Sequence, residues 1–451
     1  MTNASQPLER HYWIQLEIHD WNTQPNQNRM DGSMPDTTAE PLLILKDALI
    51  LRRYTEYWGT PEDRRVNPWD LNEPDPSVVG TIPGPVLECQ VGPPGVGEVI
   101  VVHFRNQDFR ATPSFGQRAH SLHPHGVVFP TIHDGAYPLS PPDDNQPISS
   151  GDPEENAWNQ VGVTGFKQGD RVPPGGTFTY RWSTFGWPTT AGVWLYHDHS
   201  VMDSDNTLRG AIGFIVVHNE KDPEDVSVQD LPPGGFNGDL IVDGTDRVRR
   251  YVAPPKKAFY LQLFHELHDD QDPDTAANRR GSFINGRKNL GSTPTMLGGV
   301  DTRMRFGVGA MNLLETHTFH IHGHRWVIPG PSGGHVGGEV PPGTGVQVSI
   351  MDRAVSQFED TKLLGPANTF SFTIRQGTFM GPPLGHQKGE WHMHCHVLDH
   401  MKSDGMMGSL LIVAEGDPAA GLPVGTIAMD GMVMGSGAIM RGGMSGDGTP
   451  P

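Results

Sequence analysis

Residues 391–407, WHMHCHVLDHMKSDGMM, constrain what this chain can fold into more than any other stretch. Cys395 lies between His394 and His396, and His400 follows five residues after the cysteine. A thiolate, imidazoles and a nearby thioether form the ligand set of a blue-copper electron-transfer site. Side chains alternate along an extended strand, so the flanking histidines point away from the cysteine. This tripeptide can therefore contact two metal centres, and its own bonds can carry an electron between them.

Three other short clusters supply the histidines that a second metal centre needs. They are LHPHG at 122–126, WLYHDH at 194–199 and HTFHIH at 317–322. A single histidine in a strand is usually structural, but ten of the 22 histidines occupy motif positions in these clusters and in the first stretch. Imidazole suits copper, so the pattern favours several copper ions held mainly by histidine.

In their order and internal spacing, the four clusters resemble the copper motifs of the multicopper oxidases (laccases and their relatives). The motifs read HxHG, WxYHxH, HxxHxHGH and HCHxxxH. The segments TIPGPVLECQVG (81–92) and GDRVPPGGTFTYRW (169–182) also resemble that family. The likeness covers roughly residues 80–415.

The chain as a whole is expected to be all-β. Its 56 glycines and 41 prolines, together with short apolar runs, favour many turns. Each half runs strand, histidine motif, strands, histidine motif and closing apolar strand, which indicates an internal duplication. We predict two cupredoxin-like Greek-key β-sandwich domains with antiparallel sheets, at 1–230, including an N-terminal extension, and at 231–416. A polar linker is expected at 220–250 and a flexible Met/Gly-rich tail at 417–451.

Alternating and apolar segments predict the individual strands. They lie at 11–21, 42–54, 98–106, 177–182, 192–199, 211–219, 257–267, 304–311, 369–375, 390–396 and 408–416. The 118 residues from His199 to His317 leave no room for a third whole sandwich. The chain therefore resembles the two-domain, or small, laccases.

The resemblance implies four copper ions per chain, one of type 1, one of type 2 and two of type 3. The implied type 1 ligands are His317, Cys395, His400 and, in the axial position, Met406. The implied type 2 ligands are His123 and His320. The implied type 3 ligands are His125, His197, His199, His322, His394 and His396.

The axial position departs from the family pattern. The family places its axial residue five positions after the second type 1 histidine, where this chain has Gly405. Met406 therefore requires one bulged residue in the loop, and Met401 and Met407 are rivals. A copper ion with three ligands is the other alternative, and the choice affects the redox potential.

Three further positions bear on the chemistry. Asp198 stands where a second HCH motif would have its cysteine, so only the second domain is expected to hold type 1 copper. Phe129 replaces a tyrosine that is common in two-domain laccases, so any redox role of that tyrosine is absent. Asp134 and Asp360 match acidic positions near the cluster in this family. They are candidates for proton relay, with loop capping as the alternative.

Several other residues are expected to support the fold. Cys89 lies in an alternating segment and reads as a buried structural thiol. Four histidines lie near the motifs but off their pattern, and we expect them at the surface or behind the ligands: His120, His133, His324 and His392.

The resemblance implies a laccase-type oxidase, in which phenols or aromatic amines give up electrons singly and dioxygen becomes water. One alternative is a cuprous or other metal-ion oxidase in copper tolerance, because thioethers bind Cu(I). The thioethers in question belong to the tail residues Met429, Met432, Met434, Met440 and Met444. Another alternative is a non-catalytic copper-binding or electron-transfer protein, against which the complete second ligand set argues. A copper nitrite reductase is disfavoured, because its type 1 cysteine would stand where this chain has Asp198.

Partners and compartment follow from charge and from the resemblance. The 33 basic and 52 acidic residues give a net charge of −19, which argues against nucleic acid or an anionic membrane as partner. No stretch approaches the ~20 apolar residues of a membrane span. Without a recognisable secretory signal, the chain is expected in the periplasm or outside the cell if this is the mature form, and otherwise in the cytoplasm. The two-domain relatives complete their clusters between subunits, which implies a homotrimer.

Overall fold

The computed structural model describes residues 6–23, 44–61, 82–112, 115–139, 169–220, 239–243, 248–253, 257–268, 280–288, 293, 296–300, 302–313, 315–327, 358–374, 389–413 and 418–423. The chain forms two compact units, and each is described by itself. Unit 1 comprises Met1–Trp21, Leu45–Val66 and Asp75–Asp225. Unit 2 comprises Asn22–Ile44, Asn67–Pro74 and Val226–Pro451.

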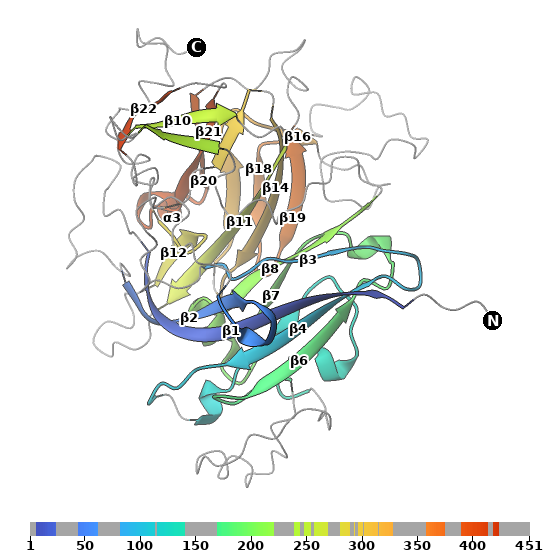
Figure 1. Cartoon of the computed structure of the whole chain (residues 1–451). Helices are drawn as coiled ribbons and strands as arrows, with labels where there is room; N and C mark the ends of the chain where they lie inside the picture. Colours follow the sequence, from blue (N-terminus) through green and yellow to red (C-terminus); the bar gives the residue numbers. More distant parts are fainter. Residues whose placement is uncertain are drawn as a thin grey trace. The chain divides into compact units, whose positions relative to one another are not determined.

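Unit 1 contains two four-stranded sheets, of order β2-β1-β4-β6 and β3-β8-β7-β5 (Figure 1). The first sheet consists of β2 (Ile44–Tyr54), β1 (Leu8–Asn22), β4 (Glu98–Asn106) and β6 (Thr177–Ser183). The second consists of β3 (Leu87–Gln90), β8 (Ile212–His218), β7 (Gly192–His197) and β5 (His123–Pro124).

Alternation along these strands builds the core of unit 1. Strands β1, β4 and β6 each contribute buried side chains, for example Tyr12, Ile14, Val102 and Tyr180. These side chains form one hydrophobic cluster with residues of the second sheet such as Ile215. Because one cluster draws on both sheets, unit 1 is a β-sandwich.

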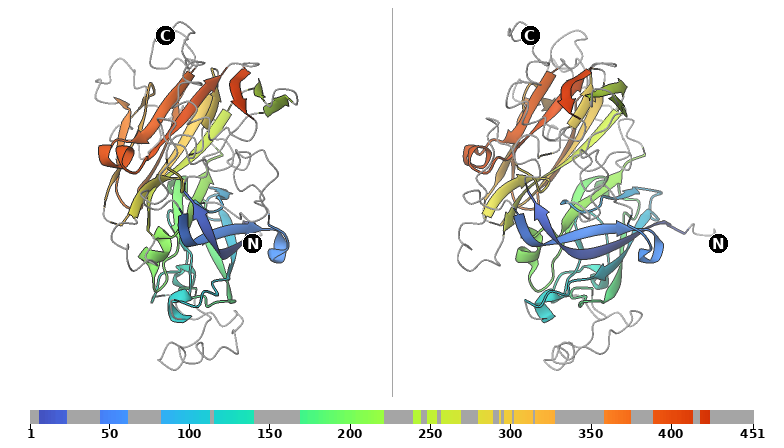
Figure 2. Two further views of the ribbon diagram at one scale, coloured as in Figure 1. Left: turned by 90° about the vertical axis from the view of Figure 1, so that its left-hand side faces the viewer. Right: turned by 60° about the vertical axis from the view of Figure 1, so that its left-hand side comes forward.

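Unit 2 is also built of strands (Figure 2). Its first sheet has β12 (Arg280–Ile284), β11 (Lys257–His268), β14 (Arg303–Met311) and β19 (Thr369–Ile374). Its second has β13 (Met296–Gly299), β21 (Met407–Val413), β20 (Gly389–Cys395), β15 (His317–Ile321) and β18 (Thr361–Leu364). Phe319 of β15 packs against Phe372 of β19, with ring centroids 5.7 Å apart, so the two sheets share an aromatic core.

The two units repeat one pairing scheme. The order β2-β1-β4-β6 matches β12-β11-β14-β19, and β3-β8-β7-β5 matches β13-β21-β20-β15. The pairs β1/β4, β3/β8, β11/β14 and β13/β21 are parallel, whereas the others in this scheme for which registers are given are antiparallel. The prediction of purely antiparallel sheets was therefore wrong. The chain passes between the two sheets from β3 to β7 and again from β12 to β15, so some strands that meet side by side run in the same direction. The all-β class is confirmed.

The described residues also include short helical segments and strands that lie outside the four sheets named above. The helical segments are η1 (Glu56–Trp58), η2 (Phe115–Arg118), η3 (Thr131–His133), η4 (Pro188–Thr190), α2 (Asp203–Leu208) and α3 (Leu398–Lys402). The peripheral strands are β9 (Asp239–Asp243), β10 (Val248–Ala253), β16 (Trp326–Val327), β17 (Phe358–Glu359) and β22 (Pro418–Pro423). Within the described ranges, no helix is long and apolar enough to cross a membrane.

Two of the expected irregular segments contain strands. The stretch 220–250, expected to be a linker, holds β9 and the start of β10. The tail was expected to be flexible from 417, but β22 pairs with β10 there. These strands form a separate sheet of order β22-β10-β9. The polar and Gly-rich residues around them had indicated irregular structure instead. The tail methionines lie outside the described residues.

Candidate metal centre

Unit 2 brings together the three residues expected at the mononuclear site. His317, at the start of β15, Cys395, at the end of β20, and His400, in α3, form a buried group whose ligand atoms all lie within 4.8 Å of one another. The Cys395 Sγ atom lies 4.0 Å from His317 Nδ1 and 3.6 Å from His400 Nδ1. The two Nδ1 atoms are 3.2 Å apart. One sulfur and two imidazole nitrogens therefore converge on one point.

Pairing between strands explains how this group assembles. Phe319 of β15 is the register partner of Cys395 in β20, so the ends of the two strands meet. The Thr318 N–H donates to the Cys395 Sγ atom at 3.3 Å. Burial lowers the pKa of His317 to about 3 and so favours a neutral imidazole that can donate a lone pair.

His400 has a different environment. Burial lowers its pKa, but interactions with Cys395 and with the Glu315 carboxylate outweigh that effect and raise the pKa to about 9. Glu315 contacts the Nε2 atom, on the far side of the ring from Cys395. The Glu315 side chain is 61% exposed and that of His400 only 5% exposed. The Glu315 carboxylate therefore connects the buried His400 ring to the protein surface.

A second group lies on the opposite face of β20 in unit 2. It consists of His320 in β15, His322 in the turn directly after β15, and His394 in β20. The Nε2 atoms of His322 and His394 lie 3.1 Å apart. His320 and His394 are register partners, with ring centroids 5.2 Å apart. Since His394 and Cys395 are adjacent in one strand, they belong to groups on opposite faces, as the alternation predicts.

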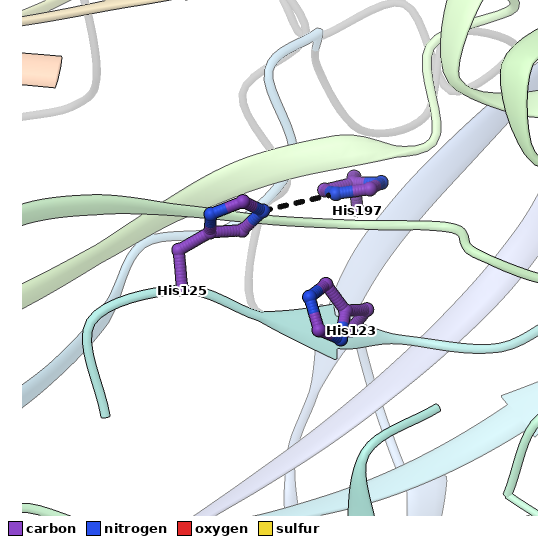
Figure 3. A group of neighbouring side chains, drawn as sticks. All are labelled: His123, His125 and His197. Atoms are coloured by element: carbon purple, nitrogen blue, oxygen red, sulfur yellow. Dashed lines mark hydrogen bonds between the residues drawn. The ribbon is translucent and has the colours of Figure 1, made fainter. Parts of the chain in front are cut away.

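Unit 1 holds a matching group, formed by His123, His125 and His197 (Figure 3). The Nε2 atoms of His125 and His197 lie 3.2 Å apart, and the His123 ring is turned toward both. His123 is the register partner of His197 across β5 and β7. Burial lowers the pKa of His125 to about 4 and that of His197 to about 3.

Backbone carbonyl groups hold the Nδ1 side of these rings. The His197 Nδ1 atom bonds to the carbonyl of Asp198 at 2.7 Å, and the His394 Nδ1 atom bonds to that of Cys395 at 2.9 Å. Each Nδ1–H donates to its carbonyl, so each Nε2 lone pair is free to bind a metal. Such partners fix the tautomer and the orientation of a metal-binding imidazole.

The remaining expected type 3 ligands, His199 and His396, stand next to these groups. The His199 ring centroid lies 5.1 Å from that of His123. The His396 ring centroid lies 5.3 Å from that of His320. His396 is exposed, so its ring is open to further partners.

The two aspartates expected near the cluster both contact the histidines expected at type 2 copper. The His123 Nδ1–H donates to the backbone carbonyl of Asp134 at 2.8 Å, and the Asp134 Oδ1 atom lies 3.1 Å away. The His320 Nδ1–H donates to the backbone carbonyl of Asp360 at 2.7 Å. The Asp360 carboxylate instead accepts from the Thr361 hydroxyl at 3.0 Å.

The candidates for the axial ligand differ in their surroundings. Met406 is fully buried, and its backbone carbonyl accepts from the Cys395 N–H at 3.1 Å. Its own N–H donates to the carbonyl of His400 at 3.0 Å. Met407 packs against Met401 in a separate small cluster. Met406 is therefore tied by its backbone to two residues of the mononuclear group.

Glu315 was not anticipated as part of the site. Its position two residues before His317 could have drawn attention to it. Its contact, however, is with His400, which lies far along the chain. Among the off-pattern histidines, His120 is completely buried and bonded to two carboxylates, so the surface alternative was wrong for it.

The donor sets fit copper. A thiolate with two imidazoles suits a blue-copper site, and groups of neutral imidazoles suit copper in general. The lowered pKa values of His125, His197 and His317 keep these three rings neutral near pH 7.

Comparison with known proteins supports this chemistry. Residues 254–416 match the family model described as multicopper oxidase. A probable nitrite reductase-hydroxylamine oxidoreductase fusion protein of Kuenenia stuttgartiensis is 24% identical over 343 residues, covering 75% of this chain and 28% of the relative. The human ferroxidase HEPHL1 is 24% identical over 430 residues, covering 89% of this chain and 29% of the relative. The chain thus spans less than a third of the length of these relatives.

One solved structure, described as a crystal structure of multicopper oxidase, covers 90% of this chain, and this chain covers 89% of it. Its identity is 14% and its TM-score is 0.47. The family match rests on the sequence of unit 2, which contains both unit 2 metal groups. The expected resemblance to the multicopper oxidases is confirmed by this match over residues 254–416.

Proposed function

We propose that the protein is a laccase-type oxidase, which removes electrons singly from phenols or aromatic amines and reduces dioxygen to water. The observation that carries the proposal is the shared tripeptide of Cys395. The cysteine belongs to the mononuclear group, and its neighbour His394 belongs to the group on the opposite face. Bound copper would supply a one-electron acceptor at the first group and a site for dioxygen reduction at the second.

The chain's own residues account for the path between the two groups. The peptide of Cys395 and His394 links them by covalent bonds and by the 2.9 Å contact between the His394 Nδ1 atom and the Cys395 carbonyl. Glu315 stands at the solvent side of His400 and can accept a proton or a hydrogen bond from a phenol. Reductant and dioxygen are thereby kept at separate places.

The proposal includes assembly of the second site from both units. The group in unit 1 and the group in unit 2 each have one histidine held by an aspartate carbonyl and one pair of facing Nε2 atoms. Four histidines from each unit would hold three copper ions. Following the two-domain relatives, we propose a homotrimer in which these halves meet between subunits. Light scattering of the copper-loaded protein tests this, and a monomer with four copper ions per chain would contradict it.

The optical spectrum of the oxidised, copper-loaded protein tests the oxidase itself. We expect an intense blue band and a near-ultraviolet shoulder, both bleached by dithionite under argon and restored by air. A blue band without the shoulder, or one that air does not restore, would contradict the oxidase. It would favour the third candidate, a copper-binding or electron-transfer protein.

A second candidate is an oxidase of Cu(I) or another metal ion. The exposed Glu315 carboxylate on His400 favours it, because a carboxylate can hold a cation next to the electron acceptor. The similar human protein HEPHL1 is named a ferroxidase. The methionines of the tail could deliver Cu(I).

Two variants distinguish the candidates. Glu315→Gln removes the charge but keeps the shape, so it should raise KM for metal ions far more than KM for an uncharged phenol. Deletion of 425–451 should lower Cu(I) oxidation and spare phenol oxidation. If both variants affect the two substrates equally, the metal-ion oxidase is contradicted.

A further inference from the structure

Unit 1 contains a counterpart of the mononuclear group that has different side chains. His120 stands three residues before the type 2 histidine of its unit, as His317 does in unit 2. Asp198 stands between two histidines, as Cys395 does. Because the strand order is the same in the two units, these residues occupy matching places.

The contacts also match. The His120 Nδ1 atom lies 2.7 Å from the Asp198 Oδ2 atom and 3.2 Å from the amide nitrogen of Asn206. In unit 2, the His317 Nδ1 atom lies 3.2 Å from the His400 Nδ1 atom. Asn206 in α2 thus takes the place that His400 has in α3.

The backbone repeats the correspondence. The Asp198 N–H donates to the carbonyl of Ala211 at 2.9 Å, and the Cys395 N–H donates to that of Met406 at 3.1 Å. The place of the expected axial methionine is therefore taken in unit 1 by an alanine, which has no donor atom.

A closed polar network fills this place. The two ring nitrogens of His120 both donate to carboxylates, Nδ1 to Asp198 and Nε2 to Asp108 at 2.9 Å. Arg110 pairs with Asp108 at 2.7 Å, so two positive side chains balance two negative ones. Burial alone would lower the pKa of His120, but the two carboxylates raise it. His120 is completely buried and both of its ring nitrogens face carboxylate oxygens, so neither nitrogen is open to copper.

The same network holds the peptide that carries two expected copper ligands. The Ser200 N–H and hydroxyl donate to Asp198 Oδ1 at 2.8 and 2.6 Å. The Asp198 carbonyl accepts from His197 Nδ1 at 2.7 Å and from the Thr207 hydroxyl at 3.1 Å. His120 and Ser200 thereby fix the Asp198 side chain, and the backbone carbonyl of Asp198 orients the His197 ring.

We propose that Asp198, anchored by His120, is a positioning residue for the type 3 histidines of unit 1. The ion pair of His120 and Asp198 holds residues 197–199 in place, as a thiolate bound to copper would hold residues 394–396. The inference rests on the proposed oxidase, because it assigns His197 and His199 to the coupled copper pair. It adds that the buried network in unit 1 is required for that pair and excludes a second mononuclear copper.

Asp198→Asn tests the proposal, since it keeps the shape but removes the charge that binds His120. The type 1 site in unit 2 should keep its blue band, which serves as an internal control for folding. The near-ultraviolet shoulder of the coupled pair should fall relative to the blue band. Copper at this pair should bind about 10–100-fold more weakly, the scale for residues that orient metal ligands. Asp108→Asn, which leaves Asp198 in place, should give a smaller change in the same direction.

A matched control lies at the other end of β8. Glu88 and His218 form a buried pair at 2.8 Å, and both side chains are 5% exposed. His218 is six residues along β8 from Ile212, the register partner of His197, or about 20 Å at the rise of a strand. Glu88→Gln should cost stability but leave the shoulder and the copper content unchanged.

The outcomes separate this inference from the proposed function. A wild-type protein without the shoulder would overturn both. A wild-type shoulder that Asp198→Asn and Asp108→Asn leave intact would overturn only the positioning role. An equal loss in Glu88→Gln would also overturn it, because the effect would then reflect stability. If Asp198→Asn does not fold, the milder Asp108→Asn decides the matter by the same ratio of bands.

Discussion

The His394 Nδ1 atom lies 2.9 Å from the backbone carbonyl oxygen of its neighbour Cys395. This contact directs the His394 Nε2 atom toward His322, while the Cys395 side chain points to the opposite face of β20. The cysteine of the mononuclear group is thus bonded to a histidine of the second group. Both functions depend on one strand that keeps its alternation up to its last residue.

Cys395→Ser should abolish the mononuclear copper site but leave the copper of the second group in place. The blue band should disappear, because a hydroxyl does not replace the thiolate. Oxidation of phenols should fall by more than the about 10–100-fold typical of a residue that only orients a ligand. Copper analysis and electron paramagnetic resonance should still find the copper of the second group. Loss of all copper from a folded variant would contradict this independence.

Substitution of the three candidate methionines should identify the axial ligand. Met406→Leu should raise the reduction potential of the mononuclear site, because a thioether close to copper stabilises the oxidised ion. Met401→Leu and Met407→Leu are the matched controls and should leave the potential unchanged. Potentiometric titration of the blue band measures all three. A shift in Met401→Leu or Met407→Leu alone would assign the role to that residue.

The sequence was informative where ligand spacing coincides with strand periodicity. His320 and His322 alternate with core residues such as Phe319 and Ile321, so the histidine pattern and the β pattern agree. Strands could be predicted where buried apolar residues alternate with less buried ones, as in β6, or form a continuous apolar run, as in β8. All residues of the three metal groups belong to the ligands that the family resemblance implied.

Contacts between distant segments were not predictable in the same way. Glu315 reaches His400 across 85 residues, and His120 reaches Asp198 across 78. No local pattern encodes such pairs, since they depend on which strands become neighbours. The parallel pairing of β1 with β4 has the same origin, because it depends on how the chain moves between sheets.

The two aspartates should differ in their effect on dioxygen reduction. The Asp134 carboxylate lies 3.1 Å from the His123 ring, whereas that of Asp360 is bound to Thr361. Asp134→Asn should therefore slow reoxidation by oxygen by about 10²-fold or more, the scale of general acid catalysis. Asp360→Asn should have a smaller effect. Stopped-flow reoxidation of the reduced protein measures this step apart from substrate oxidation.

Reduction of the blue band by a phenol under argon is the control for these variants. It should be unchanged in both, because the mononuclear group contains neither aspartate. If Asp134→Asn is reoxidised as fast as the wild type, Asp134 has only the structural role of holding a turn.

His265 should make the copper-free protein sensitive to acid. This buried ring accepts a hydrogen bond from the Gly286 N–H through Nε2 at 2.9 Å, and burial lowers its pKa to about 3. In the unfolded chain its pKa is about 6.5. Between these values the unfolded state binds the extra proton, so the free energy of unfolding rises with pH. The slope from this one group reaches about 1.4 kcal/mol per pH unit.

Denaturant unfolding of the copper-free protein between pH 4 and pH 7 measures this slope. His265→Gln keeps an acceptor for the Gly286 N–H but has no ionisable group. The variant should be less stable at pH 7, where the neutral ring packs best, yet lose less stability as the pH falls. The number of protons taken up on unfolding near pH 5 should drop by about one. The two pH profiles should therefore converge toward low pH, and parallel profiles would mean that His265 is not the group that titrates.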